Sequence, residues 1–180
     1  MGREEQIIQE RFKKLNELRK QNINPYPYKF DKKQDVKDCL KSLGKKVKTA
    51  GRVMTKRDIG KIVFCDLQDS SGKIQIVLQQ GETPEKERKL FKLVDVGDFV
   101  GIEGKVFKTK TKQISILVKK IEILSKAIKP LPEKWHGLQD KEERYRKRYL
   151  DLIMNPEAKE VFEKREKALE AIRELLKKKG

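Results

Sequence analysis

Apolar residues recur along the chain at two different spacings, and the changes in spacing divide it into three stretches. Residues 3–21 follow the helical spacing and predict an amphipathic helix whose apolar stripe is Ile8, Phe12, Leu15 and Leu18. Pro25 and Pro27 end that helix and hold the chain extended. A short second helix is expected within residues 33–43. Residues 1–45 are therefore expected to form an N-terminal helix and an extended lead-in.

From residue 46 to residue 125, apolar and polar residues alternate, as they do in strands with one buried face. Five strands are predicted, and they contain Lys46, Val63, Ile74, residues 99–108 and residues 113–124. Thr83-Pro84 begins a helical stretch between the third and fourth strands. This order is typical of the oligonucleotide-binding (OB) fold, although five strands alone are common to several small barrels. The sequence thus predicts a mainly β fold with flanking helices, in which residues 46–125 form a five-stranded Greek-key barrel.

Residues 126–180 are expected to form a C-terminal helical linker outside the barrel. Segment 127–132 contains two prolines and predicts a stiff connector, whereas residues 140–154 predict one highly charged helix. Asn155-Pro156 is typical of a helix start, so a last helix is expected from there to the C-terminal lysines. The apolar stripe of that helix needs a partner surface, which suggests that the chain was cut from a longer protein.

The charge of the chain favours a polyanionic partner. Lys and Arg number 45 against 28 Asp and Glu, so the formal net charge is +17. A field of that sign attracts nucleic acid or an anionic membrane surface. No apolar run approaches the roughly 20 residues that a membrane span needs, and the first residues lack the apolar core of a signal peptide. Nucleic acid is therefore favoured over a membrane; the remaining alternative is the solvated, lysine-rich surface of a thermophilic protein.

The sequence offers no set of residues for catalysis or for metal binding. Cys39 and Cys65 lie far apart and His136 is the single histidine, whereas a zinc site needs about four ligands. No Ser/His/Asp or Cys/His set can form around one histidine in a proline-flanked connector. Both cysteines are expected to pack as small apolar residues, a pattern that suits the reducing cytoplasm. We therefore expect no catalytic residue, metal or cofactor within this chain.

Strand periodicity selects side chains for the outer face of the barrel. If the apolar residues of each strand face the core, Phe64 on the second strand and Gln75 on the third face outward. Arg52 on the first strand falls on the same face, together with Lys48 and Lys56. An exposed ring stacks on an unpaired base, an amide reads the base edge, and cations follow the phosphates. The alternative is that Phe64 fills a gap beneath a loop or the N-terminal helix.

A series of short motifs accompanies the predicted elements. Those in and before the barrel include Asn24-Pro25-Tyr26-Pro27, Ala50-Gly51-Arg52-Val53-Met54, Gly72-Lys73-Ile74-Gln75 and Phe107-Lys108-Thr109-Lys110-Thr111. Those after the barrel cover residues 129–138 and 144–153. In order and spacing they resemble the N-terminal, anticodon-binding part of the class II lysyl-tRNA synthetases, over essentially all of residues 7–180. The last two stretches are specific to the lysyl enzymes, whereas the barrel motifs are shared with aspartyl and asparaginyl relatives.

The resemblance implies that the outer face of the barrel receives the anticodon of a lysine tRNA. In the family, a strand Phe and a strand Gln contact the central uridine, and Phe64 and Gln75 hold those positions here. Arg57 matches an arginine that contacts the same base region. The family usually has Gly-Glu before the last strand where this chain has Lys112-Gln113. The side chain expected to read an anticodon base there, Gln113, is therefore an amide instead of an acid.

The resemblance also implies what a complete enzyme would contain. The final helix is similar to the first helix of class II motif 1, which belongs to a homodimer interface, and the family's ATP and lysine sites would follow residue 180. The full-length protein is then expected to be a cytoplasmic lysine-tRNA ligase that uses ATP and Mg²⁺, while this chain binds tRNA without catalysis. Two alternatives remain: a freestanding OB-fold RNA-binding or assembly protein, and an aspartyl- or asparaginyl-type anticodon domain.

Overall fold

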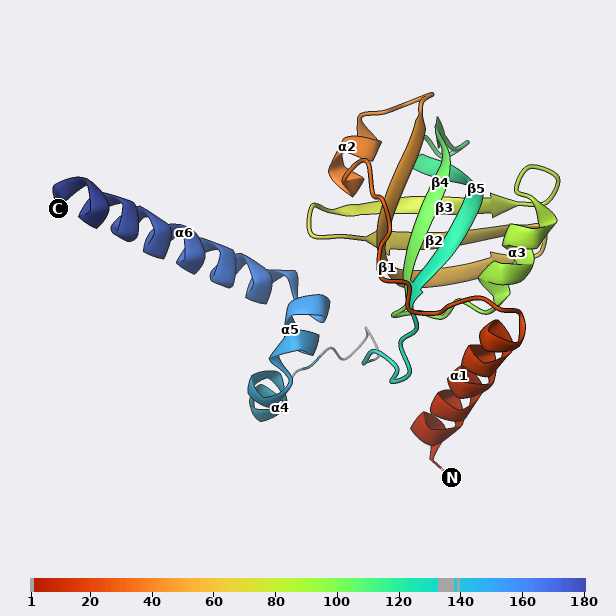
Figure 1. Cartoon of the computed structure of the whole chain (residues 1–180), viewed down its shortest axis with the longest axis horizontal. Coiled ribbons are helices and arrows are strands. Elements are labelled where there is room, and N and C mark those ends of the chain that lie inside the picture. The colour runs from red at the N-terminus through yellow and green to blue at the C-terminus, as the bar shows by residue number, and fades with distance from the viewer. Residues whose placement is uncertain (1, 133–137, 139) are drawn as a thin grey trace. The chain divides into compact units, whose positions relative to one another are not determined.

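The computed structural model describes residues 2–132, 138 and 140–180, and the chain forms two compact units, Met1–Pro130 and Leu131–Gly180 (Figure 1). The elements of the first unit are α1 (Arg3–Lys20), α2 (Val36–Leu40), β1 (Lys46–Ile59), β2 (Ile62–Gln68), β3 (Lys73–Gln79), α3 (Glu85–Lys92), β4 (Phe99–Lys108) and β5 (Ile114–Ser125). Those of the second unit are α4 (Lys141–Arg146), α5 (Arg148–Met154) and α6 (Pro156–Lys179). The motif residues 133–137, with Trp135 and His136, lie outside the described residues.

The five strands close into a barrel in the order β1-β2-β3-β5-β4, and β4 pairs back to β1. All neighbouring strands are antiparallel except β3 and β5, which run parallel to each other. The chain enters β4 through α3, so the one helix inserted among the strands lies between the third and the fourth. The predicted OB-fold order of five strands, with helices before and after them, is confirmed.

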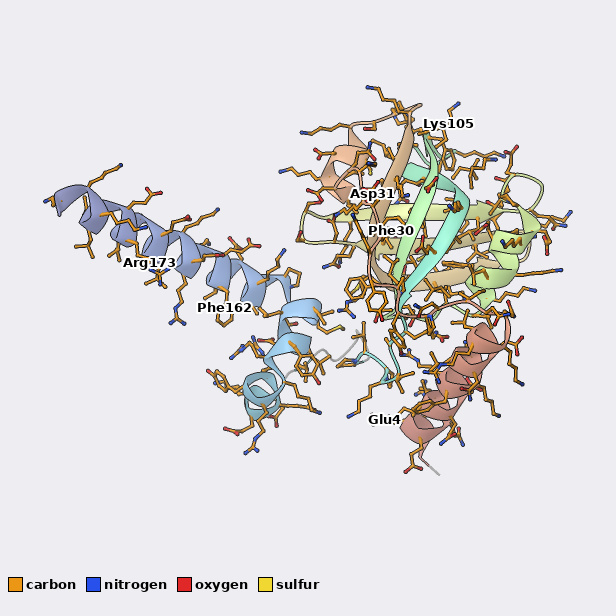
Figure 2. All side chains as sticks on the ribbon, in the orientation of Figure 1. Glu4, Phe30, Asp31, Lys105, Phe162 and Arg173 are labelled. Atoms are coloured by element: carbon orange, nitrogen blue, oxygen red, sulfur yellow. The ribbon has the colours of Figure 1, made fainter. Side chains whose placement is uncertain are left out.

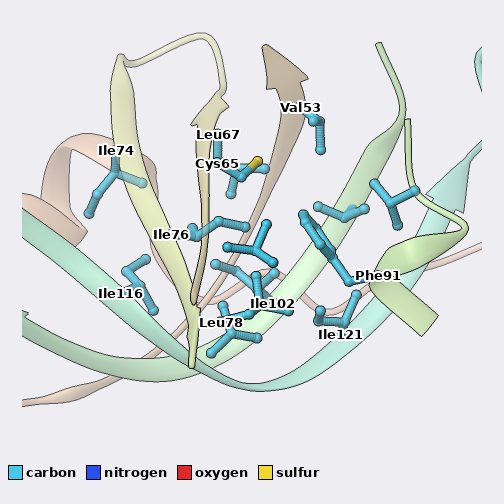
Figure 3. Packing of buried hydrophobic residues seen from close by; sticks show 14 of the residues in the cluster. Val53, Cys65, Leu67, Ile74, Ile76, Leu78, Phe91, Ile102, Ile116 and Ile121 are labelled. Carbon is cyan, nitrogen blue, oxygen red and sulfur yellow. The ribbon is translucent and has the colours of Figure 1, made fainter. Parts of the chain in front are cut away.

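Apolar side chains from all five strands fill the barrel, and Phe91 of α3 joins them (Figure 3). In β2 the predicted alternation is confirmed, because Val63, Cys65 and Leu67 are buried while their neighbours on the other side are half-buried. Cys39 and Cys65 are both buried free thiols, and burial raises the pKa of each. The two cysteines therefore pack as small apolar residues, as expected.

Strand β4 approaches β5 so closely at Gly104 that a larger residue would collide with the backbone. A Cβ atom at Gly104 would lie 2.3 Å from the backbone oxygen of Leu117. The pairing of the two strands also shifts between Glu103 and Gly104. The glycine thus permits the tight coiling of β4 that a small closed barrel requires.

Helix α1 packs on the barrel unit through a face that differs in part from the predicted stripe. Leu15 and Leu18 are buried as expected, but Phe12 is 43% exposed. Its neighbour Arg11 is buried instead, and its guanidinium donates to the backbone oxygens of Val96, Ala127 and Lys129. These three carbonyls need donors, so an arginine takes a position on the buried face that the apolar pattern could not identify.

Where α1 meets the barrel lies a group of buried and half-buried charges that we call the docking network: Lys14, Asp95, Asp98 and Lys126. The Lys126 ammonium is fully buried and donates to Asp98 at 2.7 Å, to Asp95 at 2.6 Å and to the Leu93 oxygen at 2.8 Å. Lys14 of α1 pairs with Asp95 as well. Burial acts to raise the pKa of Asp95, but the hydrogen bonds from Lys126 and Lys14 outweigh it and lower that pKa.

The second unit contains one helix more than the single charged helix predicted for residues 140–154. The chain breaks at Lys147, so α4 and α5 are separate. Across the break, the fully buried Asp151 accepts from Arg144, Arg148 and Asn155. Seven residues of unbroken helix would place Arg144 roughly 10 Å from Asp151 along the axis. The bend therefore brings these two charges together, which local propensity does not reveal.

Helix α6 follows the prediction in its extent but not in its cap. Asn155 occupies the N-cap position and Pro156 the first turn, yet the Asn155 amide donates to Asp151 and makes no cap hydrogen bond. The large apolar side chains of α6 are exposed within this unit, among them Phe162, which Figure 2 labels, whereas Ala158 is buried. Among the described residues, no helix combines the length and the apolar character that crossing a bilayer requires.

Candidate nucleic-acid interface

A β-bulge decides which residues of β1 face outward. The pairing of β1 with β2 shifts between Val53 and Thr55, so that Met54 is an extra residue in β1. The residues after Met54 exchange faces relative to a regular strand. Arg57 therefore lies opposite Phe64 on the outer side, whereas Lys56 lies opposite Cys65. The prediction that Lys56 shares the outer face with Arg52 is wrong, because a regular alternation cannot include the bulge.

Lys56 instead belongs to the packing of α3. Its ammonium donates to the backbone oxygens of Phe91 and Val94, both at 2.8 Å, and lies 5.0 Å from the centre of the Phe91 ring. These carbonyls lie at the C-terminal end of α3, where a cation is favourable. Burial lowers the pKa of Lys56. This lysine therefore stabilises the docking of the helix.

Two rows of outward side chains cross the barrel next to each other, and together we call them the open face. The first row runs through Arg57, Phe64, Val77, Leu117 and Lys105. The second row runs through Thr55, Asp66, Gln75, Ser115 and Phe107. Paired strands are about 4.8 Å apart, so neighbours in a row are within side-chain reach. The register thus brings Arg57, Phe64 and Gln75 to one surface.

On the open face, Phe64 and Arg57 differ in exposure from Gln75. Phe64 is half-buried and Arg57 is exposed. Gln75 faces outward by register, as predicted, but it is only 6% exposed, because Asp66, Ser115 and Val77 surround it on the sheet. Its Oε1 accepts a hydrogen bond of 3.0 Å from the Ser115 hydroxyl. The amide is therefore a covered group with a fixed position.

Arg52 is placed apart from this group. Its guanidinium lies 4.2 Å from the centre of the Phe99 ring and donates to the Gly97 oxygen at 3.0 Å. Burial lowers the pKa of Arg52. In the sheet, Arg52 pairs with Phe99 of β4 and Gln68 of β2, and the bulge at Met54 lies between Arg52 and Arg57. The charged group of Arg52 thus contacts the barrel itself, and its RNA contact stays a prediction.

Gln113 lies in the turn between β4 and β5, at the edge of the open face. It is exposed, and its backbone joins Thr109 in two directions: its N–H donates to the Thr109 Oγ1, and its oxygen accepts from the Thr109 N–H. Lys112 has a φ of 64°, in the left-handed region that favours glycine. Lys112 thus adopts, without glycine, a backbone conformation that glycine takes at less cost.

The lead-in between α1 and α2 covers the side of the barrel formed by β1 and β4. A Cβ atom at Gly101 would lie 2.4 Å from the Phe30 ring, and Lys48 lies 5.0 Å from the centre of that ring. Phe30 is labelled in Figure 2, where the lead-in crosses the strands. The lead-in therefore covers this side of the barrel at Gly101, and Lys48 lies beside the Phe30 ring instead of in the group predicted on the open face.

Two outward residues that the sequence did not single out belong to the open face. Asp66 lies between Thr55 and Gln75, and its carboxylate accepts a 2.6 Å hydrogen bond from the Thr55 hydroxyl. Ser115 contacts Gln75 from the other side. The alternation of β2 and β5 places both outward, but their roles become visible only when the strand register is known. The described residues hold no group of three or more His, Cys, Asp or Glu able to bind a metal.

The barrel is similar to a known domain family, and nearly the whole chain is similar to part of longer proteins. Residues 47–124 match the family described as "OB-fold nucleic acid binding domain". The chain is 47% identical over 179 residues to a lysine–tRNA ligase of Carboxydothermus hydrogenoformans, covering 97% of this chain and 37% of that protein. A lysine–tRNA ligase of Thermoanaerobacter pseudethanolicus is also 47% identical, over 97% of this chain and 36% of its own length. For lysine–tRNA ligase 2 of Methanosarcina mazei the identity is 46%, over 91% and 34%.

Proposed function

We propose that the open face of this chain, which is similar over nearly its whole length to part of the lysine–tRNA ligases and contains their OB-fold nucleic acid binding domain, binds the anticodon of a lysine tRNA. The chain spans about 37% of the length of the curated relatives that it matches. The activity of a whole enzyme is therefore a proposal about a longer protein, and the binding step is a proposal about the residues described above.

One observation carries the proposal: the register of β1, β2 and β3 lines up a cation, a ring and an amide on the outer side of the barrel. In this proposal, Arg57 contacts a phosphate, Phe64 stacks on an unpaired base, and Gln75 contacts the edge of that base. The net charge of +17 supports the approach of a polyanion. In the same proposal, Gln113, in the turn beside this group, contacts a neighbouring base.

In the complete protein, anticodon binding would serve the joining of lysine to tRNA with ATP and Mg²⁺, at a site formed outside residues 1–180. We propose that this protein is a homodimer of the cytoplasm, with α6 at its interface. The exposed apolar side chains of α6, such as Leu169 and Ile172, support an interface there. Within this proposal, the present chain contributes the choice of tRNA and none of the ligation chemistry.

The proposal is tested by titrating the chain with two anticodon stem-loops, one from a lysine-acceptor and one from an aspartate-acceptor tRNA. We expect tighter binding of the lysine stem-loop. Its affinity should fall with salt, with a logarithmic slope of about −0.7 for each phosphate contact to a single strand. Equal affinities would contradict the proposed preference for a lysine tRNA. An affinity independent of salt would contradict binding of the RNA phosphates by basic side chains.

Replacing Arg57 tests whether the RNA phosphates bind at the open face. Arg57→Ala should reduce the salt slope by about one contact, roughly 0.7. Arg146→Ala is the matched control, because the Arg146 side chain is 80% exposed on α4 and lies in the other unit. An equal change in slope for both variants would show that the net charge of the chain, and not the open face, attracts the RNA.

A further inference from the structure

In the second row of the open face, polar side chains are joined to each other by hydrogen bonds. Thr55 and Asp66 form a reciprocal pair: the hydroxyl donates to Asp66 Oδ2 at 2.6 Å and accepts from the Asp66 N–H at 3.2 Å. On the next strands, the fully buried Ser115 donates to Oε1 of Gln75, which is 6% exposed. Burying polar side chains is unfavourable unless they are hydrogen-bonded, and this bond satisfies the Ser115 hydroxyl and the Gln75 oxygen together.

These neighbours distinguish the two ends of the Gln75 amide. An amide can rotate by half a turn and exchange its oxygen with its nitrogen at almost no cost in shape. In the observed orientation, Oε1 faces the donating hydroxyl of Ser115. Asp66, which pairs with Gln75 across β2 and β3, carries an acceptor-only carboxylate that would repel Oε1 after a rotation. Both neighbours therefore favour the same orientation.

Building on the proposed function, we propose that Ser115 and Asp66 are positioning residues that fix the Gln75 amide, so that it presents its Nε2 donors to a base stacked on Phe64. Ser115 holds the oxygen on the β5 side, and Asp66, itself held by Thr55, makes the opposite orientation unfavourable. A donor in a fixed position selects a base edge with a carbonyl oxygen. Uracil offers O4 where cytosine offers an amino group, so the row discriminates between these two pyrimidines.

The experiment measures discrimination, using the 180-residue chain and pairs of stem-loops that differ by uracil or cytosine at one anticodon position. We expect Ser115→Ala to reduce the preference for uracil by about threefold to tenfold, the usual range for one hydrogen bond. Ser115→Thr keeps the hydroxyl and should restore the preference. Ser125→Ala, at the other end of β5, is the matched control and should leave it unchanged.

Two further variants separate positioning from a general loss of structure. In a Gln75→Ala background, Ser115→Ala should have no additional effect on the preference, because no amide remains to be held. Asp66→Asn should also reduce the preference, although the loss of a negative charge strengthens overall RNA binding. Thermal unfolding midpoints are measured for each variant, so that affinities are compared among folded proteins.

The outcomes separate this inference from the proposed function. If the unmodified chain binds none of the stem-loops, or if Phe64→Ala leaves binding unchanged, the proposed function fails. If binding depends on Phe64 and Gln75 while Ser115→Ala keeps the full preference for uracil, the proposed function stands and the positioning role is overturned. An equal effect of Ser115→Ala with and without Gln75 overturns the positioning role as well.

Discussion

The docking network and the open face lie on the same barrel and use charged and polar groups in opposite ways. In the docking network, the Lys126 ammonium is surrounded by Asp98, Asp95 and a carbonyl oxygen, all within 2.8 Å. On the open face, Arg57 is exposed and Phe64 is half-buried. A buried ion pair satisfied from within can specify how elements dock, whereas exposed groups keep their capacity for a ligand.

This difference separates two kinds of consequence for a substitution. Changes in the docking network should alter folding stability and leave the RNA affinity of the folded protein unchanged. Substitutions of Arg57 and Phe64 on the open face should alter RNA affinity more than stability, because Arg57 is exposed and Phe64 is only half-buried in the free protein. A substitution that moved both quantities together would show that the two regions are not independent.

The largest expected effect is on the docking network. Lys126→Met removes the cation and leaves the fully buried Asp98 carboxylate without it, which should lower the free energy of unfolding by about 3–5 kcal/mol. Lys119→Met is the matched control, because Lys119 also pairs with a carboxylate, that of Glu82, but is 47% exposed. Its effect should stay below about 1 kcal/mol. Denaturant unfolding of both variants measures the difference, and equal losses would contradict the structural role of burial.

A smaller effect is expected on the open face. Phe64→Ala should weaken stem-loop binding by roughly 1–3 kcal/mol, the usual loss for one base–aromatic stack, with little change in the unfolding midpoint. Phe12→Ala serves as the control, since Phe12 is 43% exposed on α1, away from the strands. A large fall in the midpoint of Phe64→Ala with unchanged affinity would show that the ring supports the core and does not bind RNA.

The smallest expected effect is on the pH dependence of folding stability, through Asp95 of the docking network. Hydrogen bonds from Lys126 and Lys14 lower the pKa of Asp95 in spite of its burial, so this carboxylate stabilises the folded protein above the ordinary carboxyl pKa of about 4. That stabilisation is lost as the pH falls through the range between the unfolded and folded pKa values. Asp95→Asn should therefore lose less stability than the unmodified chain between neutral pH and about pH 3, measured by urea unfolding. Parallel pH profiles for the two proteins would contradict this role.

Most of the fold could be predicted from the sequence because each barrel strand has one apolar face. The alternation of β2 placed Phe64 outward, and the spacing of turns and helix gave the strand order. Two features escaped prediction for a physical reason. The docking of Arg11 depends on carbonyl groups that are distant in sequence, and the break at Lys147 follows from ion pairs to Asp151.

The candidate site was predicted less completely, since it depends on the pairing of strands as well as on their periodicity. Phe64 and Gln75 follow from alternation, but the covered state of Gln75 follows from Ser115, forty residues away. Arg52 lies on the outer face, as alternation predicted, but its guanidinium contacts the Phe99 ring and the Gly97 oxygen, which alternation does not reveal. Arg57 was identified by resemblance alone, because the regular pattern of β1 faces it inward.

The extra residue at Met54 makes the surface chemistry of β1 depend on the number of residues in the strand. Deleting Met54 would remove the bulge and leave a regular strand, in which Val53 still pairs with Leu67 and Thr55 with Asp66. Inserting one residue between Thr55 and Lys56 would instead turn Lys56 to the outer face and Arg57 toward the core, unless a second bulge absorbed it. An insertion in this short stretch should therefore be tolerated far less than a deletion of Met54, even at positions that contact neither RNA nor the core.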